Sequence, residues 1–442
     1  MKTRMAIPRA PVLVALIALT IRPGGAWAWG EPHAIITRAA LATLPEWQKQ
    51  TLGEEWAALG SQHCLIPDRV FADRDLAKYA TMDTRTGGVY LVNLHLPGNQ
   101  VENYDVLRYF TGKAVDALRV GNMRDAARYA GTLAHALEDW SCPAHAAPGD
   151  NMFTLFKQFL PPPAAWKYPP LHGPIESGSF PLDIAPREPA ALGDSVDEAA
   201  FHLLHMANEA IIAARAEIVP IIQGLYASDT NTVTEARRRA AARGAALVAD
   251  ALNAVFLLGA QDDKARRAPA PATVDLSARV PLEATNLAFP QGAFFSKPYW
   301  GHAQRNVTLR DGTNAVPLKL VIDDGGTLAE KQFAVGIGTG TRSSLTYLVP
   351  TGVYERFTTL VGLQAGMGTA GDVQFAVLGN GKELCAARIT GGQPAKFLDC
   401  PLAGITNLQL LATSGGGSGA GNYAVWAEPR LIKSGPAPGP ER

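Results

Sequence analysis

The hydrophobic pattern of this 442-residue chain changes once along its length. From about residue 34 to 262, apolar residues recur at spacings of three and four, a period that predicts amphipathic helices. Beyond about residue 285, short apolar and alternating runs are separated by Gly, Asn and Asp, which is typical of strands in a β-sandwich. The pattern therefore predicts a multidomain chain, with an all-α domain followed by an all-β sandwich.

The same pattern divides the chain into five parts. They are a leader (1–28), a helical domain (29–264), a Pro/Ala-rich linker (265–284), the sandwich (285–434) and a short tail (435–442). Inside the helical domain, we expect long Pro/Gly-rich loops at 61–99 and 143–195. Loops of this length in a compact domain usually have a functional task.

Composition supports a folded chain and limits its partners. Hydrophobic residues make up 47% and charged residues 18%, which excludes wholesale disorder. The 40 basic and 40 acidic side chains balance, but Lys2, Arg4, Arg9 and Arg22 all lie in the leader. Its removal leaves 36 basic against 40 acidic side chains, a net charge of −4. This balance lacks the basic surface expected of a protein that holds duplex nucleic acid.

The leader has the pattern of a secretory signal. A basic start is followed by an apolar run of about a dozen residues and by Ala26-Trp27-Ala28, a small-x-small cleavage pattern. Cleavage would make Trp29 the first residue of an extracellular or periplasmic protein. An uncleaved anchor is the weaker alternative, because the run is shorter than the roughly 20 residues that span a bilayer. We expect no later segment to be long and apolar enough to span a membrane, and therefore no membrane span in the mature chain.

Export permits disulfides between the four cysteines, for which three complete pairings exist. Pairing within domains favours Cys64–Cys142 and Cys385–Cys400, the second closing a short loop between two predicted strands. Four buried free thiols are the alternative. No pair has the CxxC spacing of a metal or redox site.

The segment from His135 to His145 carries candidate metal ligands. His135 and Asp139 are four residues apart at the end of a predicted helix, so both side chains lie on one face. We expect Glu138 to point elsewhere. Pro143 ends the helix and returns His145 toward that face.

A second pair, His172 and Glu176, repeats the same spacing. Imidazole with carboxylate suits zinc. A single pair of this kind usually belongs to a solvated helix face, so the positions of the other histidines matter. His33 and His95 lie near carboxylates at helix ends or in loops. The remaining histidines are interpreted as surface or core residues: His63, His202, His205 and His302. For His202 and His205, a packing stripe is favoured over a metal pair.

These residues form an ordered set along the first part of the chain. The set is Trp29, His33, Pro67-Asp68, His95, the HxxxDxxxxxH segment from His135 to His145, and the HxxxE segment from His172 to Glu176. In residues 29–262 the chain thereby resembles the bacterial zinc-dependent phospholipase C family. Related fungal zinc nucleases share the three-metal site.

The resemblance implies three zinc ions. Their donors would be Asp68, His95, His135 and Asp139 for one, Trp29, His33 and Asp139 for a close neighbour, and His145, His172 and Glu176 for the third. Trp29 would bind through its α-amino and carbonyl groups, so removal of the leader becomes part of metal assembly. Asp68 would orient or deprotonate the attacking water. Asp73, Asp75 and Asp83 are competing carboxylates in the same loop.

A site of this kind hydrolyses phosphoric esters. Glu176 as the last donor and the acidic balance favour a phospholipase C-type enzyme acting on phospholipid or another phosphodiester. A single-strand nuclease or nucleotidase is the first alternative, and a non-catalytic, metal-stabilised scaffold is the second. No counterpart of the family's choline-contacting residues is found, which leaves the headgroup open.

Residues 285–434 resemble the NPCBM family of carbohydrate-binding modules, on the segments GVYERFTTLVGLQAGMGTAGDVQFAVLGNGKEL and NYAVWAEPRLI. The resemblance implies a β-sandwich that binds a glycan or another cell-surface ligand. Candidates for stacking on sugar rings are Tyr299, Trp300, Tyr354 and Trp426. For Tyr354 and Trp426, a place in the core is the favoured alternative. Docking on a membrane through exposed aromatic loop tips is another.

Overall fold

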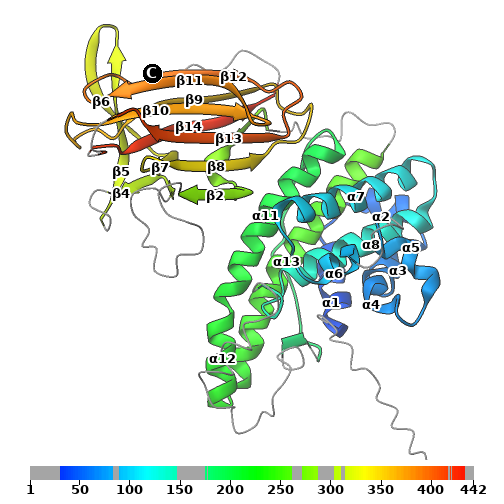
Figure 1. Ribbon diagram of the computed structural model, residues 1–442. Helices are drawn as coiled ribbons and strands as arrows, with labels where there is room; N and C mark the ends of the chain where they lie inside the picture. Colours follow the sequence, from blue (N-terminus) through cyan, green and yellow to red (C-terminus); the bar gives the residue numbers. More distant parts are fainter. Residues whose placement is uncertain are drawn as a thin grey trace, which may run out of the picture.

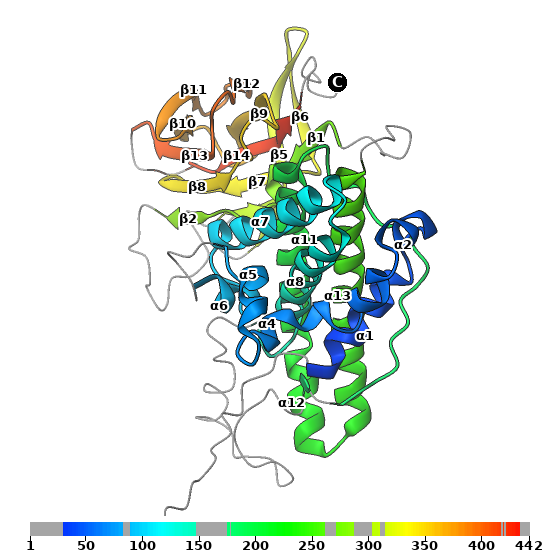
Figure 2. The same ribbon diagram turned by 90° about the vertical axis from the view of Figure 1, so that its right-hand side faces the viewer.

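The computed structural model describes residues 30–82, 89–146, 175–176, 178–260, 271–286, 303–309, 314–416, 419 and 421–433. In this part of the chain the elements up to Gly259 are helical and the later strands form antiparallel sheets. The predicted fold class is therefore confirmed. The sheets adjoin one end of the helical part, at the upper left in Figure 1 and above it in Figure 2.

The longer helices are α1 (Gly30–Leu41), α7 (Gln100–Arg119), α8 (Met123–Trp140), α11 (Val196–Ala216), α12 (Ile218–Ala227) and α13 (Thr230–Gly259). Shorter ones are α2 (Glu46–Leu52), α3 (Glu55–Leu59), η1 (His63–Leu65), α4 (Ile66–Arg69), η2 (Arg74–Leu76), α5 (Ala77–Ala80) and α6 (Val89–His95). The expected loop at 61–99 is thus mostly short helices. None is long enough for a helical hydrophobic period to show in the sequence.

Helix α8 is the centre of the helical part. The Asn122 side chain accepts a hydrogen bond from the Asp125 backbone N–H and caps its first turn. Helices α1, α6, α7 and α13 all contact it, and every residue from Ala130 to Trp140 is buried. Polar side chains inside such a helix need partners. The last turn and a half of α8 carries three such side chains, His135, Glu138 and Asp139.

Two glycines let other segments approach α8 closely. A Cβ at Gly131 would lie 2.4 Å from the carbonyl carbon of His63, so the absence of a side chain allows η1 to pack against the helix. A Cβ at Gly244 of α13 would lie 2.3 Å from Ser141 Oγ, just beyond the end of α8. Glycine at these two positions therefore allows η1 and α13 to pack closely against the C-terminal half of α8 and the residue that follows it.

Two helical stretches, Val196–Ala227 and Thr230–Gly259, are long and apolar enough to cross a membrane by length and composition. The expectation that no later segment reaches these limits is therefore wrong. The apolar window of the second stretch is 78% buried inside the protein. Helix α13 contacts α1, α7, α8 and α11, and a core helix meets the same criteria as a span.

The strands form three antiparallel sheets. Their bounds are β1 (Thr273–Asp275), β2 (Glu283–Asn286), β3 (Gln304–Arg305), β4 (Val307–Leu309), β5 (Ala315–Asp324), β6 (Thr327–Phe333), β7 (Gly336–Thr339), β8 (Ser343–Leu348), β9 (Arg356–Leu363), β10 (Asp372–Gly379), β11 (Lys382–Thr390), β12 (Lys396–Pro401), β13 (Asn407–Ser414) and β14 (Ala424–Ile432). One sheet has the order β12-β9-β14-β7-β3, with β1 added to β14. The second has the order β11-β10-β13-β8-β2, and β4-β5-β6 form the third.

The two larger sheets enclose a hydrophobic core. Phe375 of β10 and Trp426 of β14 meet edge to face with ring centroids 5.1 Å apart. The predicted disulfide Cys385–Cys400 is confirmed. It joins β11 of one sheet to β12 of the other, so it ties the two layers together covalently.

The helical part and the sandwich share a polar contact. Lys433, which follows β14, lies with Nζ 2.6 Å from Glu198 Oε1 of α11. Tyr354 Oη lies 3.3 Å from His202 Nε2, and Arg279 donates to His202 Nδ1 at 3.0 Å. Arg279 belongs to the segment expected to be a linker, where β1, the 3-10 helix η5 (Leu276–Ala278) and the start of β2 also lie.

Candidate metal centre

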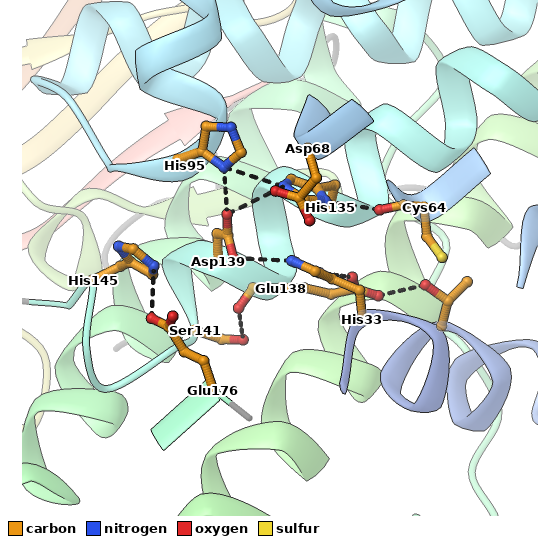
Figure 3. Close-up of polar contacts among 11 residues, drawn as sticks. His33, Cys64, Asp68, His95, His135, Glu138, Asp139, Ser141, His145 and Glu176 are labelled. Carbon is orange, nitrogen blue, oxygen red and sulfur yellow. Dashed lines mark hydrogen bonds and ion pairs between the residues drawn. The ribbon is translucent and has the colours of Figure 1, made fainter. Parts of the chain in front are cut away.

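The last turn and a half of α8 carries three fully buried polar side chains, His135, Glu138 and Asp139. Figure 3 shows side chains from α1, α4 and α6 pointing toward them, and the backbone carbonyl of Cys64 in η1 facing His135. His135 and Asp139 are neighbours on one face, with His135 Nε2 3.2 Å from Asp139 Oδ2. The predicted pair therefore shares one site.

A backbone carbonyl orients His135. Its Nδ1 donates to the carbonyl oxygen of Cys64 in η1 at 2.7 Å. A carbonyl can only accept, so the proton lies on Nδ1 and the lone pair on Nε2 faces the cluster. Orientation of one ring nitrogen by an acceptor is the usual arrangement of histidines that bind metal.

His33 enters the same cluster from α1. Its Nδ1 lies 2.6 Å from Glu138 Oε2 and its Nε2 lies 3.3 Å from Asp139 Oδ1. Thr37, one turn further along α1, donates to Glu138 Oε1 at 2.5 Å. The expectation that Glu138 points away from the site is therefore wrong. Adjacent helical residues differ by about 100° in direction, and α1 packs on the side of α8 that Glu138 faces.

His95 and Asp68 complete the first cluster. His95 Nδ1 lies 3.0 Å from Asp139 Oδ2 and 3.2 Å from His135 Nε2. Asp68 Oδ1 lies 3.9 Å from His135 Nε2. The two oxygens of Asp139 thus face different imidazoles, Oδ1 toward His33 and Oδ2 toward His95 and His135. Donor atoms of two overlapping groups, His33–His135–Asp139 and Asp68–His95–His135, each lie within 4.8 Å of one another.

Two of the three competing carboxylates lie away from the cluster. Asp73 and Asp75 are exposed, and Asp73 accepts from the backbone N–H of Asp75 as the cap of η2. Asp83 lies outside the described residues. Asp68, 8% exposed, is therefore the carboxylate of this segment that the structure brings to the cluster.

A second cluster follows the end of α8. Donor atoms of Cys142, His145 and Glu176 all lie within 4.8 Å of one another, and the three residues are buried. His145 Nε2 is 3.1 Å from Glu176 Oε1. Two expected donors, Trp29 and His172, lie outside the described residues.

The predicted disulfide Cys64–Cys142 is wrong, because both cysteines are free and buried. Cys64 contacts α8 at His135 through its carbonyl oxygen. Cys142 lies seven residues after His135 in the chain, beside His145 and Glu176. Burial raises the pKa of both thiols. The other predicted pair is the only one of the two that the structure joins.

The first cluster concentrates negative charge away from water. Asp68, Glu138 and Asp139 are all buried, and three buried carboxylates without cations would be very costly. Burial lowers the pKa of His33, but Asp139 and Glu138 outweigh it and the pKa is raised well above its usual value. Burial raises the pKa of Asp139, but His135 and His33 outweigh it and hold the pKa well below its usual range.

The donor chemistry fits zinc. His33 Nε2 and Asp139 Oδ1, which face each other at 3.3 Å, and Asp68 Oδ2 are buried and make no well-aligned hydrogen bond within the described part of the chain. All three atoms border the cluster, where imidazole nitrogen and carboxylate oxygen are the ligands that zinc takes. A cation there would satisfy these atoms and offset the buried charge.

The other histidines have different surroundings. His63 Nε2 lies 2.8 Å from Glu55 Oε2, and His202 lies at the contact with the sandwich. Burial lowers the pKa of His205 to about 4, and the charge of Arg279 adds to this effect. None of these three belongs to a metal-donor group among the described residues, and His302 lies outside them.

Three groups that support the cluster were not predicted from the sequence: Glu138, Thr37 and the carbonyl of Cys64. One signal was present, since His33 and Thr37 are four residues apart on α1 and share a face.

Of the aromatic residues considered for sugar binding, Trp426 is 1% and Tyr354 2% exposed. Both are core residues, as the favoured alternative had it, and Tyr299 and Trp300 lie outside the described residues.

Comparison with known proteins gives a family for the second part of the chain. Residues 296–432 match the family model of the NPCBM/NEW2 domain, so the expected resemblance is confirmed there. No curated protein matches the chain.

Three solved structures illustrate the similarities. CBM51 of GH95 from Clostridium perfringens, in complex with methyl-galactose, is 22% identical over 36% of this chain and 99% of its own, with a TM-score of 0.30. The CBM51-2 and INT domains of ZmpB from the same organism, in complex with GlcNAc, are 21% identical over 36% of this chain and 31% of theirs, with a TM-score of 0.30. Alpha toxin from Clostridium absonum is 10% identical over 91% of this chain and 94% of its own, with a TM-score of 0.29.

Proposed function

Since residues 296–432 match the NPCBM/NEW2 domain, we propose that this protein is a secreted zinc-dependent phosphoric ester hydrolase that a carbohydrate-binding module directs to its target. The helical part would perform phospholipase C-type cleavage of a phospholipid headgroup. One observation carries the hydrolase proposal: the two oxygens of Asp139 face separate imidazoles inside a buried cluster of carboxylates.

The proposed zinc ligands are those that the sequence resemblance implies. One ion would be held by Asp68, His95, His135 and Asp139, a second by Trp29, His33 and Asp139, and a third by His145, His172 and Glu176. When bound, paired zinc ions lower the pKa of a water molecule toward neutrality and neutralise charge on phosphate oxygens. A carboxylate with its two oxygens turned to different donors suits two cations a few ångströms apart.

The protein's own groups have separate tasks in this proposal. Glu138, which accepts a hydrogen bond from Thr37, holds His33, and the Cys64 carbonyl holds His135. The imidazoles are therefore oriented before a ligand arrives. Asp68 Oδ2 is buried and has no hydrogen bond to the described residues. We assign Asp68 the role of orienting the attacking water or accepting its proton.

The proposal requires cleavage before Trp29. Helix α1 begins at Gly30, the next residue, and His33 lies within its first turn. The α-amino group of Trp29 becomes a ligand only after the leader is removed and the amine has lost a proton. Intact mass of the exported protein tests this step directly.

The test of the whole proposal begins with the signal-cleaved chain. We expect about three zinc ions per chain and hydrolysis of phosphatidylcholine in preference to single-stranded DNA and bis-p-nitrophenyl phosphate. His135→Ala and Asp139→Ala should abolish turnover and reduce zinc content. Asp116→Asn, at an exposed position of α7, is the matched control and should change neither.

Other results separate the alternatives. Preferred cleavage of single-stranded DNA would favour the nuclease, and bound zinc without turnover of any substrate would favour the scaffold. For the module, binding of the isolated full-length protein to a glycan array that includes galactose and N-acetylglucosamine tests the proposed targeting. Absence of glycan binding would remove that part of the proposal and leave the hydrolase untouched.

A further inference from the structure

The cluster after α8 contains a sulfur donor that the proposed zinc ligands do not include. Cys142, His145 and Glu176 place one donor atom each within 4.8 Å of the others. The exposed fractions of the three residues are 0%, 3% and 2%. Figure 3 shows His145 and Glu176 facing one another beside the end of α8. Three metal-binding side chains therefore meet in a space closed to bulk water.

Backbone hydrogen bonds fix Cys142 relative to His145. The Cys142 N–H donates to the Asp139 carbonyl at 2.9 Å, and the Cys142 carbonyl accepts from the N–H groups of His145 at 3.1 Å and Ala146 at 3.0 Å. These bonds wind the chain into a tight turn directly after α8. The two donors thus belong to one turn, and the thiol position is set by the same backbone that positions Asp139.

Cys64 offers an internal comparison. It is equally buried and free, but it belongs to no metal-donor group among the described residues. Cys385 and Cys400 are joined in a disulfide. Substituting Cys64 and Cys142 one at a time is therefore sufficient to assign a thiolate ligand to one of them.

We propose that Cys142 is a metal ligand through its thiolate and that, with His145 and Glu176, it forms a sulfur-containing zinc site. This inference rests on the proposed function for His145, His172 and Glu176 and adds a fourth donor, Cys142, to that site. Sulfur, nitrogen and oxygen donors together are typical of zinc. A thiolate also favours zinc, cobalt and cadmium over magnesium, calcium and manganese.

The thiolate changes the charge of this site. Cys142 and Glu176 together carry two negative charges when they bind, which balances a divalent zinc ion. A neutral site attracts a phosphate anion less than a site with residual positive charge. The inference therefore makes this ion an anchor for the turn after α8, and assigns the handling of phosphate mainly to the first cluster.

The experiment uses the full-length, signal-cleaved chain loaded with cadmium or cobalt. We expect an ultraviolet thiolate-to-metal charge-transfer band in the wild-type protein and in Cys64→Ser. The band should disappear in Cys142→Ser. Chelator titration of the zinc-loaded Cys142→Ser variant should release one ion at concentrations that leave the others bound.

Several outcomes would overturn the inference. They are absence of the band in wild-type protein, its persistence in Cys142→Ser, and its loss in Cys64→Ser alone. If Cys142→Ser does not fold, X-ray absorption of the zinc-loaded wild type decides, because a Zn–S distance of about 2.3 Å is required. Its absence would refute the sulfur ligand.

Failure of this inference is distinguishable from failure of the proposed function. If His145→Ala and Glu176→Gln lose one zinc while Cys142→Ser retains every zinc, only the sulfur ligand is refuted. If none of the three variants changes the metal content, the third zinc of the proposed function fails with it.

Discussion

Glu138 provides the sharpest test of how the first cluster is organised. Its Oε2 accepts from His33 Nδ1 at 2.6 Å and its Oε1 accepts from Thr37 Oγ1 at 2.5 Å. Glu138→Gln keeps the shape of the side chain. The amide oxygen can still accept from His33, and the amide nitrogen can donate to the Thr37 hydroxyl. The substitution therefore removes one buried negative charge and leaves the hydrogen bonds in place.

Two effects of opposite sign follow. Mutation of an outer partner of a histidine that binds metal typically costs about 10–100-fold in metal affinity, or about 1.4–2.8 kcal/mol, and here the loss of the negative charge beside His33 would be the cause. The metal-free protein should become more stable, because one of three buried carboxylates, with Asp68 and Asp139, no longer carries a charge. The increase in melting temperature on adding zinc should therefore be smaller than in wild type, because the zinc-free form is more stable and zinc binds more weakly.

The assay is chelator competition for zinc together with thermal melting of the zinc-free and zinc-loaded forms. Glu235→Gln, an exposed carboxylate on α13 paired with Arg238, is the control and should match wild type in both. Glu138→Ala should bind zinc more weakly than Glu138→Gln, since it also loses both hydrogen bonds. A Glu138→Gln protein that binds zinc normally and melts earlier when zinc-free would refute the reasoning and leave Glu138 as an ordinary buried hydrogen-bonding residue.

Three further predictions concern the packing around the site and the sandwich. Gly131→Ala should displace η1, destabilise the protein by about 1–3 kcal/mol and weaken zinc binding, because the new Cβ would lie 2.4 Å from the carbonyl carbon of His63. The matched control in thermal melting and zinc titration is Gly112→Ala, whose Cβ would lie 3.5 Å from its nearest neighbour. Reducing Cys385–Cys400, or Cys400→Ser, should cost the sandwich about 3 kcal/mol, the value for a loop of 15 residues, with zinc content unchanged. Burial raises the pKa of Glu198, but hydrogen bonds from His202 and Lys433 outweigh it and lower the pKa. The ionised Glu198 therefore stabilises the folded protein fully above the ordinary carboxyl pKa, and this stabilisation is lost as the pH falls through the lowered value. Melting temperatures measured from neutral to acid pH should therefore fall less steeply in Lys433→Met than in wild type, and equal slopes would contradict the assignment.

The period of apolar residues was sufficient to predict both halves of the fold, because α7, α8, α11 and α13 are long enough to show it. It was insufficient for η1, α4 and η2, each of which is three or four residues long. The first two of these helices place the Cys64 carbonyl and Asp68 at the cluster, so two of the missed elements matter for the site.

Spacing along the chain predicted neighbours on one helix and failed for contacts between helices. His135 and Asp139 share a face because they are four residues apart. Glu138 is next to Asp139 in the sequence, and its role depends on where α1 crosses α8. The pairing of Cys64 with Cys142 failed for the same reason, since counting cysteines gives no information on which part of α8 each one contacts.

The arrangement of donors couples metal binding to folding in the proposed function. The first cluster takes side chains from four elements, with His33 on α1, Asp68 on α4, His95 on α6, and His135 and Asp139 on α8. Without cations, the buried carboxylates repel one another and oppose the packing of these elements. With cations, the same charges hold α1, α4 and α6 against α8. Since the terminal amine of Trp29 exists only after cleavage, the second proposed zinc position can be completed only after export, and the last step of folding would then coincide with activation outside the cell membrane.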